Sequence, residues 1–179
     1  MPPVRAADPL EDPKGYVEFV LSYLGDDDPA EAQARTPAML RELVRDAGDD
    51  VRTRPAPGEW SVLECVGHIT GAEIVSTARC RWIVAQDEPT LVGYDQNLWV
   101  ERLRANDADP VELLDLFEAL RRANLVFWAR SSEEERARVG MHVERGPESF
   151  ELLFRLIAGH DRVHYEQAVQ TKEAVFRTR

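Results

Sequence analysis

Apolar residues recur at helical spacing along most of the chain. From Tyr16 to Leu24 they follow i, i+3, i+4, i+7 and i+8, which predicts a short amphipathic helix that ends at Gly25. Longer segments show the same period of about 3.6 residues. They predict four further helices, over residues 28–47, 61–86, 109–130 and 147–177.

Residues typical of helix N-termini stand at the start of these segments. An Asp followed by a Pro opens the segments at 28–29 and 109–110, because Asp caps free backbone N–H groups and Pro suits the first helical turn. Ser61 and Glu64 have the spacing of a capping box. Pro37 lies inside the first long helix and predicts either a kink or a fresh start capped by the preceding threonine.

The connections differ greatly in length. The link at 87–109 is long enough to cross the whole domain, and it holds a marginal strand-like run at 91–94 and a short predicted helix at 97–103. A polar stretch, MHVERGPES at 141–149, is predicted to be a loop in which Pro147 opens the last helix.

These elements place the chain in the all-α class. Four long amphipathic helices pack most economically as a four-helix bundle. The long link lets the second and third helices run parallel while shorter links favour antiparallel neighbours, so we expect an up-down-down-up order. A chain of 179 residues suits one domain. We expect it to span residues 14–179, after a flexible segment at 1–13.

Composition narrows the class of partner. The formal net charge is −11 and the pI is near 4.9, which argues against binding to nucleic acid or to an anionic membrane and favours a small-molecule partner. No apolar run reaches the roughly 18 residues of a membrane span, and residues 1–13 lack the apolar core of a secretory signal. Cys65 and Cys80 are about 22 Å apart on one predicted helix, so they cannot form a disulfide with each other. We therefore expect a cytoplasmic protein.

Two histidines stand on the apolar face of the last predicted helix. His160 and His164 are one turn apart, and Leu153, Leu156 and Ile157 fall within about 60° of His160 around the helix axis. A buried imidazole needs partners for both ring nitrogens. The pair therefore calls for hydrogen-bonding neighbours or a shared metal ion.

A third histidine can join this pair. In the expected bundle the second and fourth long helices are antiparallel, and His68 lies at a depth that matches the pair within the uncertainty of the helix ends. Three neutral imidazoles form a facial set for a divalent transition ion, Zn²⁺ or Ni²⁺ above all, with at least one coordination position open. The predicted metal ligands are His68, His160 and His164. His142 lies in a polar loop and is not expected to be a ligand.

These residues resemble a known family. The run from Arg54 to Glu73, RPAPGEWSVLECVGHITGAE, together with AGHDRVHYEQ at 158–167, is similar to the DinB-like (YfiT-like) family of metal-dependent proteins. The resemblance extends from about Tyr16 to the end of the last helix. It implies a four-helix bundle, often dimeric, with a divalent metal on three histidines. Relatives in this family include transferases and isomerases that use a low-molecular-weight thiol.

Other polar residues lie on inward faces. Arg121 and Asn124 are candidates for binding a carboxylate-bearing thiol or substrate, since a guanidinium offers two parallel donors; the alternative is an Arg paired with a buried acid such as Glu64. Glu73 and Gln167 are candidates for hydrogen bonds to the outer nitrogens of the ligand histidines.

We expect a metal-dependent enzyme in which the ion binds a thiol or a water and lowers its pKa, with thiol-dependent transfer as the leading hypothesis. Two alternatives stay open, since the same three ligands would serve all of them. One is a metal-dependent hydrolase that uses the bound water. The other is a bundle that binds the metal without catalysis.

Overall fold

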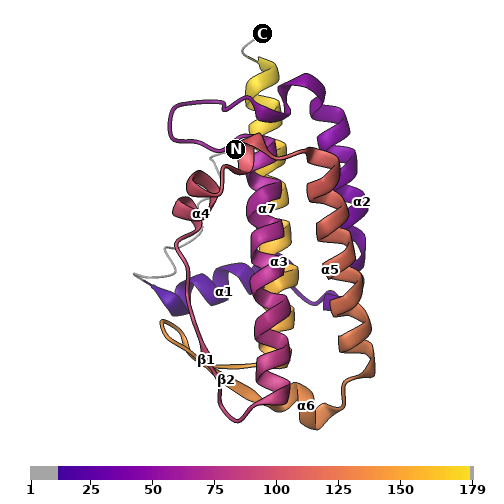
Figure 1. Ribbon diagram of the computed structural model, residues 1–179, viewed down its shortest axis with the longest axis vertical. Coiled ribbons are helices and arrows are strands. Elements are labelled where there is room, and N and C mark those ends of the chain that lie inside the picture. The colour runs from indigo at the N-terminus through magenta and orange to yellow at the C-terminus, as the bar shows by residue number, and fades with distance from the viewer. Residues whose placement is uncertain (1–11, 178–179) are drawn as a thin grey trace.

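The computed structural model describes residues 12–177. Of the segment predicted to be flexible at 1–13, residues 1–11 lie outside them, whereas Asp12 caps the first helix and Pro13 begins it. Helices dominate the chain (Figure 1). The four long ones are α2 (Pro29–Ala47), α3 (Val62–Ala85), α5 (Pro110–Arg130) and α7 (Phe150–Arg177). The shorter elements are α1 (Pro13–Leu24), α4 (Gln96–Arg102), α6 (Glu133–Ala137) and two 3₁₀ segments at Gly48–Arg52 and Ala105–Asp107.

The four long helices form the predicted bundle. In Figure 1, α2 and α7 run in one direction and α3 and α5 in the other, so the order is up-down-down-up. Helices α3 and α7 lie side by side through the middle of the molecule, and α2 and α5 pack on one flank. Helices α1 and α4 cover the other flank. The antiparallel α3 and α7 are therefore the two helices that can share a site.

The predicted caps are present. The Asp28 carboxylate accepts a hydrogen bond from the Glu31 N–H at 2.8 Å. Ser61 and Glu64 form a full capping box, in which each side chain accepts from the backbone N–H of the other residue. Each contact satisfies an N–H that the first turn of a helix leaves free. These local contacts explain why the sequence placed the helix starts correctly.

Helix α2 continues through Pro37 without a fresh start. Because proline has no N–H, the carbonyl of Gln33 one turn earlier loses its usual partner. Arg121 of α5 donates to that carbonyl at 3.1 Å. The proline thus opens a backbone acceptor that a neighbouring helix fills.

One part of the prediction was wrong. Residues 141–149 are not a loop, because β2 (Val139–His142) and β3 (Gly146–Ser149) form an antiparallel hairpin. The short β1 (Thr90–Leu91) pairs with β2 in parallel. Pro147 lies in β3 rather than at the start of α7, which begins at Phe150. Strand pairing between segments some fifty residues apart leaves little signal in local periodicity.

The hydrophobic core lies where the long helices pack against one another. Its largest buried side chains include Phe117, Phe150 and Phe154, each at most 1% exposed. Trp128 stacks on Phe154 with ring centroids 4.1 Å apart, which joins the ends of α5 and α7. Across residues 12–177, no helix has the length and apolar character needed to cross a bilayer.

Helix α1 packs very closely on α7 at Gly159. A Cβ atom at this position would lie 2.2 Å from the carbonyl oxygen of Val20. Val20 is fully buried there, and α1 also brings Tyr16 to the wall of the central pocket. Only glycine permits this approach, because the obstacle is backbone rather than a movable side chain.

We expect Gly159→Ala to lower the free energy of unfolding by about 1–3 kcal/mol, the range for an overpacked interior. Chemical denaturation would measure it. The control is Gly71→Ala in α3, where the new Cβ would make an ordinary contact 3.5 Å from the Trp99 ring. That variant should be as stable as the natural protein or slightly more so, because alanine favours a helix. Equal effects of the two substitutions would contradict the close contact.

Candidate metal centre

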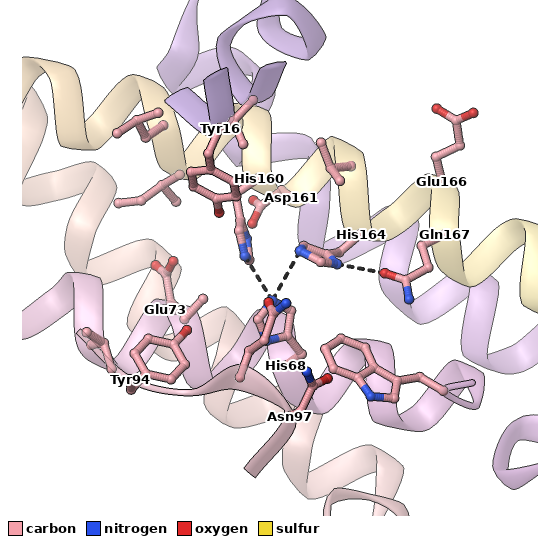
Figure 2. Close-up of a pocket in the computed structure, with 18 of the residues that line it drawn as sticks. Tyr16, His68, Glu73, Tyr94, Asn97, His160, Asp161, His164, Glu166 and Gln167 are labelled. Atoms are coloured by element: carbon pink, nitrogen blue, oxygen red, sulfur yellow. Dashed lines mark hydrogen bonds between the residues drawn. The ribbon is translucent and has the colours of Figure 1, made fainter. Parts of the chain in front are cut away.

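Three imidazoles meet between α3 and α7. The Nε2 atom of His68 lies 3.0 Å from Nε2 of His160 and 3.1 Å from Nε2 of His164. Figure 2 shows the ring of His68 reaching up from α3 while the other two rings point down from α7. The three atoms fall within 4.8 Å of one another. The structure therefore brings together all three histidines that the sequence predicted.

The helix geometry explains this meeting. His160 and His164 share one face of α7 because they are one turn apart. The face points at α3, which carries His68. Trp60, just before α3, packs its ring against His68 with centroids 5.0 Å apart. The rings are thus held in position by their own helices and by one aromatic neighbour.

Burial keeps the three rings neutral. His68 and His164 are 4% and 7% exposed, and His160 is half-buried. Burial, followed by the neighbouring imidazoles, lowers the pKa of His68 well below its ordinary value. Burial, followed by His164 and then by the charges of Arg121 and Arg145, lowers the pKa of His160 well below its ordinary value. Burial lowers the pKa of His164 to about 4. Neutral imidazole is the form that binds a metal ion.

Hydrogen bonding alone cannot satisfy this arrangement. The Nδ1 atom of His164 faces the Oε1 atom of Gln167 at 2.8 Å, so Nδ1 carries the ring proton and Nε2 presents a lone pair. His68 Nε2 has at most one proton, yet it faces two nitrogens. In one of the two short contacts, therefore, either neither nitrogen directs a proton of its own at the other or both do. A cation that accepts three lone pairs removes the conflict, so the donor set fits a divalent transition ion.

Gln167 holds the outer nitrogen of one ligand, as the sequence predicted. We expect Gln167→Ala to weaken metal binding by about 10- to 100-fold, because the lost hydrogen bond fixes the tautomer and orientation of His164. Competition with a chromophoric chelator would measure the affinity. Gln170→Ala, three residues further along α7, is the control and should retain the natural affinity. A Gln167→Ala variant with unchanged affinity would show that the hydrogen bond does not support the centre.

The low imidazole pKa values also predict how the metal-free protein responds to acid. The unfolded chain takes up a proton at each histidine below about pH 6.5, whereas folded His164 does so only near pH 4. The contribution of His164 to the free energy of unfolding is therefore complete above about pH 6.5 and is lost as the pH falls toward 4. We expect His164 to lower the free energy of unfolding by about 3 kcal/mol over this pH range. Denaturation of chelator-treated protein at several pH values would measure the change. His164→Gln should show a smaller loss, and identical pH profiles would contradict the prediction.

A large pocket surrounds the centre. Its volume is about 1150 Å³, and α1, α3, α4, α7 and the hairpin all contribute to its wall. Figure 2 shows Tyr16 and Tyr94 directed toward the space beside His160, with Glu73 between the two phenols and Asp161 next to His160. Burial raises the pKa of both phenols, for Tyr94 to about 12, so both hydroxyls are protonated at neutral pH. The open side of the centre thus faces a space that can hold a small molecule.

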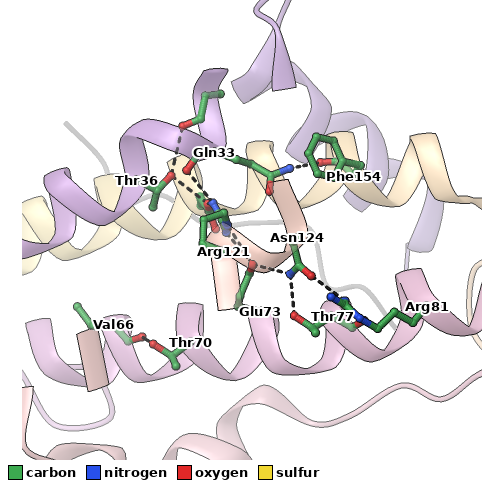
Figure 3. A network of polar contacts seen from close by, with 12 residues as sticks. Gln33, Thr36, Val66, Thr70, Glu73, Thr77, Arg81, Arg121, Asn124 and Phe154 are labelled. Carbon is green, nitrogen blue, oxygen red and sulfur yellow. Dashed lines mark hydrogen bonds and ion pairs between the residues drawn. The ribbon is translucent and has the colours of Figure 1, made fainter. Parts of the chain in front are cut away.

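Arg121 and Asn124 take part in a buried polar network (Figure 3). Arg121 donates to both carboxylate oxygens of Glu73, at 3.0 and 2.8 Å, and to Asp161 at 2.6 Å. Asn124 donates to Glu73 and to the Thr77 hydroxyl. Neither residue lines the pocket. Their role in binding a ligand stays a prediction, and the contacts favour the alternative of an Arg paired with buried acids.

Several other predicted roles can be compared with the structure. Glu64 is paired with Arg54 instead of Arg121. Glu73 does not contact an imidazole, because both of its oxygens are bound by the network. Cys65 is a buried core residue, and burial raises the pKa of its thiol, so it is unsuited to be a thiolate ligand. Partner choice across helices depends on packing that the sequence pattern does not specify.

Sequence reasoning missed part of the pocket wall. His142 and Arg145 line the pocket together with the two tyrosines. The sequence predicts His142 in a polar loop, yet it lies in β2 and is 3% exposed because this strand packs against α3. Gly140 and His142 are two residues apart and are both buried, as expected for one face of a strand. This alternation is the one local signal that could have identified His142 as a buried residue.

The comparisons with known proteins agree with this architecture. A family model described as the DinB superfamily matches residues 32–168, a range that includes all three histidines. A protein of Oceanobacillus iheyensis, named as a candidate metal-dependent hydrolase, is 25% identical over 130 residues, which cover 72% of this chain and 74% of that protein.

A solved structure shares the fold. It is YfiT from Bacillus subtilis, described as a probable metal-dependent hydrolase with an unusual four-helix bundle topology. The TM-score is 0.75 at 21% sequence identity, and the match covers 85% of this chain and 86% of that one. At this identity the likeness establishes the bundle topology and leaves the chemistry to the residues of the site.

Proposed function

The chain belongs to the DinB superfamily, and from that premise we propose that it is a metal-dependent enzyme acting on a small molecule, with the ion on His68, His160 and His164. The observation that carries the proposal is the convergence of three neutral imidazole Nε2 atoms at the wall of a large pocket. Zn²⁺ and Ni²⁺ are the ions that three imidazoles suit best. When bound, such an ion would lower the pKa of a nucleophile in its open coordination position.

The residues around the centre have separate tasks. The ring of Trp60 covers one side of His68 and limits the access of water from that direction. Gln167 holds the proton of His164 on Nδ1, which keeps its Nε2 lone pair directed at the centre. Tyr16 and Tyr94 offer protonated hydroxyls that can donate a hydrogen bond to an oxygen atom of the substrate.

Hydrolysis, with water as the nucleophile, is one form of this chemistry. It is supported by the names of the two relatives, which describe them as candidate metal-dependent hydrolases. Two buried carboxylates that line the pocket, Glu73 and Asp161, are both bound to Arg121 and are not free to act as a general base. Hydrolysis would therefore depend on the ion to activate water, without help from these two carboxylates.

Transfer to a low-molecular-weight thiol is the second form. A thiol ionises near pH 8.5, so it needs less activation than water and no carboxylate base. Cys65 and Cys80 are both buried and burial raises the pKa of each thiol, so the nucleophile would be a separate molecule. The pocket volume of about 1150 Å³ exceeds the usual range of about 300–1000 Å³ for one ligand and leaves room for two reactants.

A substrate panel would test the proposal and separate its two forms. The metal-loaded protein would be incubated with esters, amides and alkyl or epoxide electrophiles, with and without added thiols. Turnover without thiol would support hydrolysis, and turnover only with thiol would support transfer. The control is the His160→Ala/His164→Ala variant. If that variant turned over the same compounds at the natural rate, the proposed centre would not be the catalyst.

A further inference from the structure

Two buried nitrogen atoms in the pocket wall lack hydrogen-bond partners. Among the residues that the structure describes, Nε of Arg79 and Nε2 of His142 are buried without any such partner. Arg79 is 6% exposed and His142 is 3% exposed. Both residues line the same pocket as the three imidazoles. A buried donor without a partner costs free energy, so each atom calls for an acceptor.

The ring proton of His142 can be located from its other nitrogen. The Nδ1 atom accepts hydrogen bonds from the backbone N–H groups of Glu144 at 3.2 Å and Arg145 at 3.4 Å. An accepting Nδ1 carries no proton, so in the neutral ring the proton is on Nε2. Burial and the nearby charge of Arg145 lower the pKa of His142 to about 4, which keeps the ring neutral at pH 7. Nε2 is therefore a donor without an acceptor.

The positive charge of Arg79 has no direct counterion. Its terminal nitrogen donates to the carbonyl of Val92, and within residues 12–177 no carboxylate forms an ion pair with it. Arg145 differs, because it is paired with the buried Glu148. Burial, and then the charge of Arg145, lowers the pKa of Arg79, and the opposing charges of Glu148 and Glu144, which form no ion pair with it, do not outweigh this. A buried cation of this kind would be stabilised by an anionic ligand.

The two donors belong to one region of the pocket. Arg79 acts electrostatically on His142 and on the phenol groups of Tyr16 and Tyr94. In sequence Arg79 follows His68 by 11 residues, which is about 16 Å along the axis of α3 toward the hairpin. The region therefore lies at the hairpin end of the pocket.

We propose that Arg79 and His142 form a carboxylate-binding subsite, and that a reactant of this protein carries a carboxylate which enters it. The two N–H groups can each donate to one oxygen of the carboxylate, and the charge of Arg79 is balanced by its single negative charge. A phosphate dianion would bring a second negative charge next to Glu144, which also lines the pocket. That the ligand is a reactant rests on the proposed function, whereas the binding of a carboxylate does not.

A binding measurement tests the subsite without any turnover. Hexanoate and its neutral match hexanamide would be titrated into the protein at neutral pH, with dissociation constants read from ligand-observed NMR. We expect hexanoate to bind at least about tenfold more tightly than hexanamide, because only the anion forms charge-assisted hydrogen bonds. The preference should persist in the His160→Ala/His164→Ala variant. The proposed metal centre and the proposed subsite can therefore be contradicted independently of each other.

Different substitutions in the pocket wall are expected to change the affinity for hexanoate in opposite directions. Arg79→Gln should weaken hexanoate binding by about tenfold or more and leave hexanamide unchanged. His142→Asn retains an acceptor near the position of Nδ1 but removes the Nε2 proton, and should weaken binding by about three- to tenfold. Glu144→Gln should strengthen binding, because it removes a negative charge from the pocket wall.

The matched control is Arg81→Gln, which removes an arginine from the same helix outside the pocket lining. Circular dichroism and thermal unfolding would establish that each variant is folded. Equal hexanoate affinity in the Arg79→Gln and Arg81→Gln variants, or in the His142→Asn variant and the natural protein, would overturn the proposal. So would inorganic phosphate binding more tightly than hexanoate.

Discussion

Replacing His68 by alanine is expected to abolish metal binding and to reduce turnover to the background rate. Two ligands from one helix remain, but the site loses the imidazole that links α3 to α7. The loss of affinity should exceed the roughly 10- to 100-fold expected when an outer hydrogen bond such as that of Gln167 is removed. Elemental analysis after dialysis would measure the metal content, with about one ion per chain expected in the natural protein.

A second readout does not depend on activity. Added Zn²⁺ should raise the thermal midpoint of the metal-free natural protein, because a ligand that binds only the folded state stabilises it. It should leave the midpoint of His68→Ala unchanged. His142→Asn is the matched histidine control and should bind the ion normally, since His142 is not one of the three converging ligands. A His68→Ala variant that still carried one ion per chain would place the metal elsewhere.

Replacing Arg121 by methionine is expected to cause the largest loss of stability. Arg121 is 1% exposed and pairs with Glu73 and Asp161, which are also buried. Burial alone would lower the pKa of Arg121, but the two carboxylates outweigh it and raise that pKa. Without the guanidinium, both carboxylates would remain buried with no cation. The free energy of unfolding should fall by about 3–5 kcal/mol, the usual cost of breaking a buried ion pair on one side.

The control for this prediction is an arginine with the same number of carboxylate partners at the surface. Arg41 of α2 contacts Asp115 and Glu118 of α5, and the three side chains are 39%, 63% and 50% exposed. Arg41→Met should cost no more than about 1 kcal/mol, since water solvates the charges that remain. Chemical denaturation of both variants would measure the difference. Similar losses for Arg41→Met and Arg121→Met would mean that water reaches the interior network.

Much of the bundle is encoded locally. The Asp28 and Ser61 caps define helix starts through hydrogen bonds to residues three positions away. The apolar period of the long helices gives their inward faces, and the length of the link at 87–109 was enough to predict that α3 and α5 run parallel. The resemblance to the DinB-like family agreed with these features.

Local sequence patterns did not predict the hairpin or the partners in the buried network around Arg121. Strands β2 and β3 are four residues each, and their pairing with β1 depends on segments far apart in the chain. Arg121 was correctly placed on an inward face, but its acidic partners come from α3 and α7. Side-chain length and helix packing decide which of several buried acids an arginine reaches, and neither is visible in a local pattern.

The histidines mark the boundary between the two kinds of information. Helical periodicity alone set His160 and His164 on one face, and antiparallel packing placed His68 at their level, because the rise per residue of a helix is constant. The position of His142 in the pocket wall was decided only by tertiary structure. Burial of a charged or polar side chain is a property of what packs over it, so the unpartnered donors became visible only once the hairpin lay against α3.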